Sequence, residues 1–310
     1  MPYVELHASS AFSFLRGGSS PEDLVKVATQ QGLTGFGLCD RNGVYGAVRA
    51  HTAAKEAGLR AWVGAEITME DESVVPVLAT SRSGYLNLCR LLTLAKLRAK
   101  KGEARASWDE LRDHAGGLIG LSGDTEGPLL RAWHRGDMRG METQMQRLLS
   151  VFRPGNLHVE LQRHFIRDED RSEAALIDLA RKYRVPLLAT NGVVYATREA
   201  RRIADVFSCL RHHTTLDAAG TRLAENSERQ IKSPAAMEAL FSDIPEAIRN
   251  TEAVAERLEF SLSDLGYRFP DYPVPAGEDQ ISFLKKMTFF GAQQRYGSVT
   301  GKVRKQLEHE

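Results

Sequence analysis

Three side chains of metal-ligand type end three short apolar segments of the chain: His7, Asp40 and Glu66. In a barrel of alternating strands and helices, the C-terminal ends of the strands meet at one mouth, where catalytic groups are placed. A histidine, an aspartate and a glutamate gathered at such a mouth can bind divalent ions that activate water for attack on a phosphate ester. These residues therefore predict a hydrolase-type metal site.

The neighbouring positions indicate that this site has lost part of its ligand set. Ser9 lies two residues after His7, where an extended segment would place a second imidazole on the same face, and a hydroxyl is a poor ligand for transition metals. Arg41 directly follows Asp40, and Arg16 supplies another cation. Arginine can neutralise a carboxylate through paired hydrogen bonds. We expect a mouth held by arginine paired with Asp40 or with the glutamate, and a site with one residual metal ion is the alternative.

Short apolar segments alternate with amphipathic ones through the first two thirds of the chain. This alternation predicts parallel strand–helix units, arranged as a barrel or as an open doubly wound sheet. A barrel is favoured because candidate polar residues end several different strands and because no G-x-G-x-x-G motif follows the first strand. The predicted strands are Tyr3–His7, Gly35–Cys39, Ala61–Ile67, Val74–Ala79, Leu118–Leu121, Leu157–Leu161 and Pro186–Ala189. The predicted helices between them are Pro21–Gln31, Tyr45–Glu56, Gly84–Leu97 and Asp168–Tyr183.

The last quarter of the chain has a different character. Helical patterns without strands follow residue 234, and three prolines between residues 270 and 275 predict an extended linker. Two further helices are predicted at Ile281–Tyr296 and Lys302–Glu310. Because the chain stops within a charged helical pattern, we expect it to be a fragment of a longer protein.

Composition limits the class of protein. The 310 residues are 42% apolar and 26% charged, with a net charge of +1 and three widely spaced cysteines. These values favour a globular protein of the reducing cytoplasm without a disulfide framework, and no membrane span is predicted. One basic cluster, with Lys96, Lys100 and Lys101, is interpreted as a solvated helix end or as a patch that contacts nucleic-acid phosphates. It contains no interleaved aromatic residues, so we expect weak, salt-sensitive binding at most.

Several short motifs occur along the chain in a characteristic order. They are His7–Ser10, Gly43–Ala47, Gly64–Glu66, Leu118–Gly123, Val159–His164, Ala189–Asn191 and the tail Tyr267–Pro275. With these motifs the chain resembles the N-terminal PHP (polymerase and histidinol phosphatase) domain of bacterial C-family DNA polymerases. Within that family it is most similar to the error-prone, damage-inducible branch of the alpha subunit.

The resemblance implies a fold and its boundaries. It implies an α/β fold in which a distorted seven-stranded (β/α) barrel of PHP type is followed by a short helical C-terminal segment. The PHP barrel would cover residues 1–265, a proline-rich linker residues 266–280, and the truncated start of the polymerase core residues 281–310.

The resemblance also implies which metal positions survive. His7, Asp40 and Glu66 match ligands of the family, and His164 follows a predicted strand as a further candidate. Five aligned positions carry other residue types, which indicates a vestigial metal site with none or one residual divalent ion. These substituted positions are Ser9, Arg16, Arg41, Gly192 and Val194.

For the full-length protein the resemblance implies an error-prone DNA-directed DNA polymerase for translesion synthesis. Such an enzyme would use Mg²⁺, bind DNA and nucleotides through the polymerase core, and contact other translesion or replication proteins. No Asp-x-Asp pair follows residue 275, so no catalytic residue is expected in this chain, which we interpret as an inactive scaffold. The alternatives are a metal-dependent phosphoesterase or 3′–5′ exonuclease with a reduced site, and a protein-interaction module.

Overall fold

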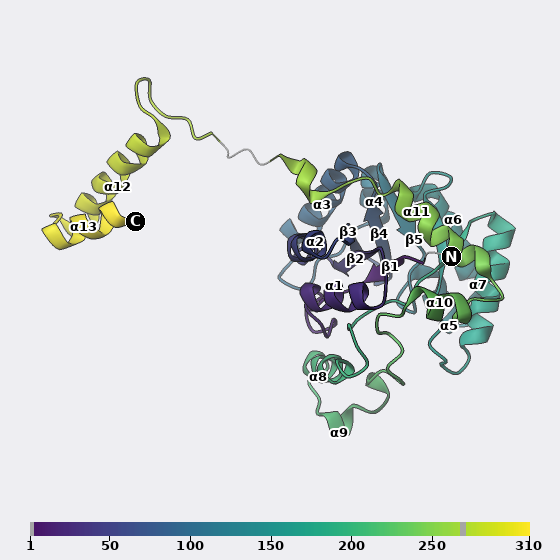
Figure 1. Ribbon diagram of the computed structural model, residues 1–310. Coiled ribbons are helices and arrows are strands. Elements are labelled where there is room, and N and C mark those ends of the chain that lie inside the picture. Colours follow the sequence, from purple (N-terminus) through teal and green to yellow (C-terminus); the bar gives the residue numbers. More distant parts are fainter. Residues whose placement is uncertain (1–2, 267–270) are drawn as a thin grey trace. The chain divides into compact units, whose positions relative to one another are not determined.

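One seven-stranded sheet organises the larger part of the protein (Figure 1). The computed structural model describes residues 3–266 and 271–310, and the chain divides into two compact units, residues 1–265 and 266–310. The predicted linker therefore lies partly outside the described residues. Hydrogen bonding joins the strands in their chain order: β1 (Glu5–Ala8), β2 (Gly35–Arg41), β3 (Arg60–Thr68), β4 (Val74–Ala79), β5 (Leu118–Leu121), β6 (Leu157–Leu161) and β7 (Leu187–Ala189).

The expectation of uniformly parallel units is wrong at β4. This strand runs antiparallel to both β3 and β5, whereas the other neighbouring pairs are parallel. A parallel crossover needs a dozen or more residues, but only residues 69–73 connect β3 to β4. They form a tight turn in which Met69 N donates to the carbonyl of Ser73 at 2.8 Å.

The two ends of the strand order are linked by backbone hydrogen bonds. Ser9 N donates to the Val193 carbonyl at 2.7 Å, and Val193 N donates to the His7 carbonyl at 3.0 Å. The sheet is thus curled, so that the end of β1 lies beside the segment that follows β7. The expected α/β architecture, seven strands in a distorted barrel followed by a helical segment, is confirmed.

Helices surround the sheet in Figure 1. In the larger unit they are α1 (Pro21–Gln30), α2 (Ala47–Glu56), α3 (Arg82–Leu97), α4 (Trp108–His114), α5 (Pro128–His134), α6 (Met138–Val151), α7 (Glu169–Tyr183), α8 (Arg201–Arg211), α9 (Leu216–Ala219), α10 (Pro234–Leu240) and α11 (Pro245–Arg257), with 3₁₀ turns at Gly220–Arg222 and Leu262–Leu265. Four predicted helices match α1, α2, α3 and α7 within two residues at either end. Helices α4, α5 and α6 were not predicted.

Apolar burial brings the polar strand ends together. In β1, Leu6 lies in an apolar cluster with Leu78 and Ile119. Because side chains alternate along a strand, His7 projects to the opposite side from Leu6. Burial of Leu6 contributes about 1.5–3 kcal/mol to folding and holds His7 at the mouth of the curled sheet.

The smaller unit contains two helices, α12 (Gln280–Tyr296) and α13 (Gly301–His309). The start of α12 is capped by Asp279, whose side chain accepts a hydrogen bond from Ser282 N at 2.8 Å. Both helices agree closely with the predicted ranges. Among the described residues, no helix combines the length and apolar character needed to cross a membrane.

Candidate functional site

His7 lies between two buried carboxylates from other strands. Its Nε2 is 3.0 Å from Glu66 Oε1 on β3, and its Nδ1 is 2.7 Å from Glu160 Oε1 on β6. Burial alone would lower the pKa of His7, but the charge of Glu160 and the hydrogen bonds to both carboxylates raise this pKa well above its usual value. A protonated imidazole donates from both nitrogens, so the placement of His7 between two carboxylates suits its protonated form.

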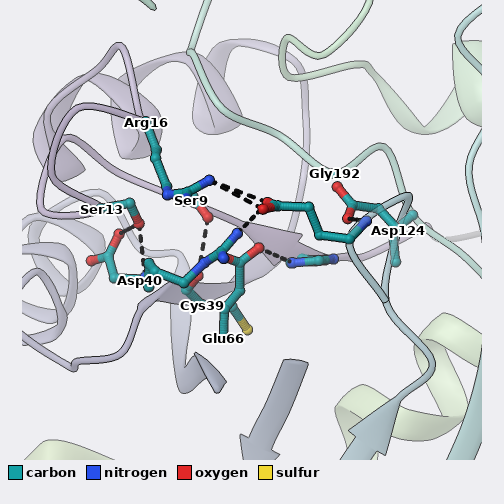
Figure 2. Close-up of polar contacts among 12 residues, drawn as sticks. Ser9, Ser13, Arg16, Cys39, Asp40, Glu66, Asp124 and Gly192 are labelled. Atoms are coloured by element: carbon teal, nitrogen blue, oxygen red, sulfur yellow. Dashed lines mark hydrogen bonds and ion pairs between the residues drawn. The ribbon is translucent and has the colours of Figure 1, made fainter. Parts of the chain in front are cut away.

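Arg41 forms the second cationic bridge. Arg41 Nε contacts Glu66 Oε2 at 2.5 Å, and Arg41 Nη2 donates to Glu126 Oε2 (Figure 2). Burial would raise the pKa of Glu66, but the charges of Arg41 and His7 outweigh it and hold this pKa far below the usual range. Glu126 also accepts from Arg16 Nη1 at 3.2 Å. Both oxygens of Glu66 are therefore engaged by protein cations.

A further cation of the mouth, Arg229, lies in the segment between α9 and α10. Its Nη2 is 2.9 Å from Asp124 Oδ2, and its Nε donates to the Gly192 carbonyl at 2.7 Å. Burial opposes ionisation of Asp124, yet the charge of Arg229 lowers the pKa of that carboxyl. Cations and carboxylates thus alternate across the mouth.

Asp40 belongs to a different set of contacts. Its Oδ1 accepts hydrogen bonds from Ser10 N at 2.7 Å and from Ser13 Oγ at 2.9 Å, and Ser10 Oγ donates to both carboxylate oxygens. Burial raises the pKa of Asp40 despite these bonds. Adjacent residues of a strand project to opposite sides, so Arg41 pairs with Glu66 rather than with Asp40. The structure decides between the two partners that the sequence left open.

The remaining metal candidate, His164, is directed at other partners. Its Nε2 is 2.9 Å from the Asn191 carbonyl, and its Nδ1 is 3.5 Å from Glu169 Oε1. It lines a pocket of about 330 Å³ together with Glu160. Within residues 3–266 and 271–310, no group of three or more His, Cys, Asp or Glu side chains is arranged to hold a metal ion.

The substituted positions are filled by local contacts. Ser9 Oγ donates to the Cys39 carbonyl at 3.0 Å (Figure 2), and Val194 lines a cavity of about 250 Å³ with Ser9 and Arg41. Gly192 has a φ of +53°, and a Cβ atom there would approach the Gln162 amide at 2.5 Å. Any side chain at position 192 would therefore displace the Gln162 amide.

Sequence reasoning missed three charged members of the mouth. Asp124 and Glu126 follow β5 within five residues, so the same strand-end argument that selected His7 could have found them. Arg229 follows no strand and carried no local signal. The predicted nucleic-acid contacts Lys96, Lys100 and Lys101 do not join the ion pairs; they line a groove beside the mouth.

Comparisons with known proteins identify relatives along the chain. The family model described as "PHP domain" matches residues 5–164. An error-prone DNA polymerase of Caulobacter vibrioides is 37% identical over 99% of this chain, and one of Symbiobacterium thermophilum is 35% identical over 100% of it. The chain spans 28% and 30% of the length of these two relatives. A solved structure described as an amidohydrolase from Chromobacterium violaceum covers 62% of this chain, and the chain covers 87% of it, at a TM-score of 0.44 and 12% identity.

Proposed function

The chain belongs to the PHP domain family, and we propose that it is the PHP region of an error-prone DNA polymerase, with a scaffold role in place of metal-dependent hydrolysis. Similarity to error-prone polymerases over at least 99% of the chain supports the first part of the proposal. The contacts of one residue, Arg41, support the second.

The proposal assigns the two compact units to two parts of a longer enzyme. In this proposal residues 1–265 are the PHP barrel, residues 266–280 the linker and residues 281–310 the start of the polymerase core; the division of the chain into two compact units supports the first boundary. The polymerase core would use Mg²⁺ and bind DNA and nucleotides in translesion synthesis in the cytoplasm, together with accessory proteins. Reading the gene beyond codon 310 tests this assignment: a long open frame encoding an Asp-x-Asp pair supports it, and an immediate stop contradicts it.

The family implies divalent metal at the barrel mouth, and the residues present do not fit one. A metal ion needs several unprotonated donors that converge on one point. Here both ring nitrogens of His7 are already within hydrogen-bond distance of carboxylates, and the Arg41 guanidinium bridges Glu66 and Glu126. The bridge made by Arg41 is the observation that carries the proposal, because it places a fixed cation on the carboxylates that a metal would need.

The arginine bridges also give the mouth a structural role. Arg41 ends β2, Glu66 lies on β3, and Glu126 lies in the segment between β5 and α5. Ion pairs that are shielded from water hold such elements in register, and removal of one partner leaves an uncompensated charge. We infer that the mouth now stabilises the barrel that would support the polymerase core.

Metal stoichiometry tests the scaffold proposal directly. The purified chain is exposed to excess Zn²⁺ and Mn²⁺, freed of unbound ion and measured by elemental analysis, with Glu66→Gln as the comparison. We expect substoichiometric metal that is equal in both proteins. One ion or more per chain that is lost in Glu66→Gln would overturn the proposal and favour the reduced phosphoesterase or exonuclease.

Hydrolysis provides a second readout on the same protein. A 3′-labelled oligonucleotide is incubated with the chain and with the double variant Ser9→His, Arg41→His. We expect no metal-dependent cleavage by either protein, because Gly192 and Val194 still lack ligand side chains. Cleavage by the double variant would show that the remaining residues suffice for catalysis.

A further inference from the structure

A basic groove opens beside the ion-paired mouth of the larger unit. It encloses about 850 Å³ and is lined by eight arginine and lysine side chains but by only two carboxylates, Glu72 and Glu126. Arg16, Arg41, Glu126 and Arg211 line both this groove and the cavity at the mouth, so the two spaces adjoin each other.

Ion pairs within the groove leave most of its positive charge uncompensated. Arg16 and Arg41 share Glu126, and Arg105 pairs with Glu72 at 2.8 Å. The other five cations have no carboxylate within ion-pair distance in the described part of the chain; they are Lys96, Lys100, Lys101, Arg131 and Arg211. Burial and the neighbouring charges of Arg16 and Arg41 lower the pKa of Arg211, as expected where positive charge accumulates. Such a groove attracts a polyanion.

Two aromatic side chains are exposed within the same groove. Phe14, from the segment between β1 and α1, is 81% exposed, and Tyr45, which precedes α2, is 58% exposed. Lys96 Nζ donates to the Tyr45 hydroxyl, so the C-terminal part of α3 holds this ring. The lysine cluster contains no interleaved aromatic residue, but segments that are distant in sequence bring Phe14 and Tyr45 to the same groove.

We propose that this groove binds single-stranded DNA, with bases stacked on Phe14 and Tyr45 and phosphates bound by Lys100, Lys101 and Arg131. A cationic groove with exposed aromatic rings is the arrangement by which proteins bind single strands without sequence preference. Bases of a duplex are already stacked on one another, so the exposed rings favour an unpaired strand. The inference rests on the proposed function for its DNA substrate and adds to it a contact made by the barrel itself.

Fluorescence anisotropy of a labelled oligothymidylate tests the proposal. The full chain is titrated onto an oligomer of about 20 nucleotides, long enough to cover one such groove, in EDTA and over a range of salt concentrations. The variants are Lys100→Ala with Lys101→Ala, Phe14→Ala, and Tyr45→Ala. Matched controls are Lys26→Ala with Lys55→Ala, two exposed lysines outside the groove, and Phe165→Ala, an aromatic that is 72% exposed elsewhere.

We expect each aromatic variant to bind about fivefold more weakly or worse, at an unchanged salt dependence. Loss of both lysines should weaken binding and reduce the slope of log affinity against log salt by about 1.4, which is about 0.7 for each phosphate contact. Both controls should bind like the unmodified chain. All substituted residues are exposed, so the variants should retain the melting temperature of the parent.

Four results would overturn the proposal: groove variants that bind like the parent, a control lysine pair that loses as much affinity, tighter binding of a duplex than of the single strand, or equal competition by polyglutamate. The last two would assign the groove to another polyanion. EDTA removes divalent ions, so the DNA affinity of the groove is measured without any contribution from metal at the mouth. A failure of the metal-stoichiometry test would therefore leave the outcome of the DNA titration unchanged.

Discussion

Replacing Arg41 by methionine tests whether the barrel mouth depends on its arginine bridge. The substitution keeps the apolar stem and removes the guanidinium from Glu66 and Glu126. The side chains of Arg41 and Glu66 are 12% and 9% exposed, so their pair is largely shielded from water. Glu126 is 40% exposed, so its ion pair with Arg41 contributes little to the free energy of unfolding.

The expected loss of unfolding free energy in Arg41→Met follows from these exposures. Breaking a buried ion pair costs about 3–5 kcal/mol because one charge is left without a partner. His7 still contacts one oxygen of Glu66, so we expect a value at the lower end, about 3 kcal/mol. Arg16→Met is the matched control, because Arg16 contacts the same Glu126 from a side chain that is 32% exposed; it should cost less than about 1 kcal/mol.

Urea unfolding followed by tryptophan fluorescence measures the loss of unfolding free energy in the larger compact unit of the chain. Its signal comes from that unit because Trp62, Trp108 and Trp133 all belong to residues 1–265. The double variant Arg41→Met, Glu66→Gln should be less destabilised than Arg41→Met alone, because it removes the orphaned charge. Equal losses in Arg41→Met and Arg16→Met would refute the reasoning. So would a double variant whose loss equals the sum of the two single losses.

Two further predictions concern pH and packing. The folded-state pKa of His7 lies above the unfolded value, so its contribution to stability is complete below about pH 6.5 and is lost as the pH rises through the raised pKa. The difference in unfolding free energy between the parent and His7→Gln should therefore shrink above about pH 6.5, and a constant difference would contradict this. Gly84 of α3 lies against the backbone of the turn before β5, where an added Cβ would meet the Gly117 carbonyl oxygen at 1.9 Å. Gly84→Ala should cost about 2 kcal/mol or more in urea unfolding, whereas Gly116→Ala, whose Cβ would have 3.5 Å to its nearest neighbour, should stay within about 0.5 kcal/mol.

Local sequence patterns predicted most of the elements that carry the site. All seven strands were found, because each is a short apolar run bounded by turn residues. Of the three strand-end residues singled out as metal ligands, His7 and Glu66 contact each other, whereas Asp40 contacts Ser10 and Ser13. Helices α4 and α5, each seven residues long, were not predicted, and neither was the longer α6. The direction of β4 was missed because strand pairing is set by the connection and not by the apolar pattern of the strand itself.

Amino-acid sequence by itself determined that His7, Asp40 and Glu66 end apolar strands and that arginines lie near them in the chain. Tertiary structure decided which side chains pair. Arg41 forms an ion pair with Glu66, and Asp40 accepts hydrogen bonds from serines. Arg229 forms an ion pair with Asp124, which is 105 positions away in the chain. It also brought Phe14 and Tyr45 to the lysines that follow α3. The physical reason is range. Periodicity and turn chemistry act over a few residues, whereas ion pairs and grooves form between side chains that only the curled sheet brings within a few ångströms of each other.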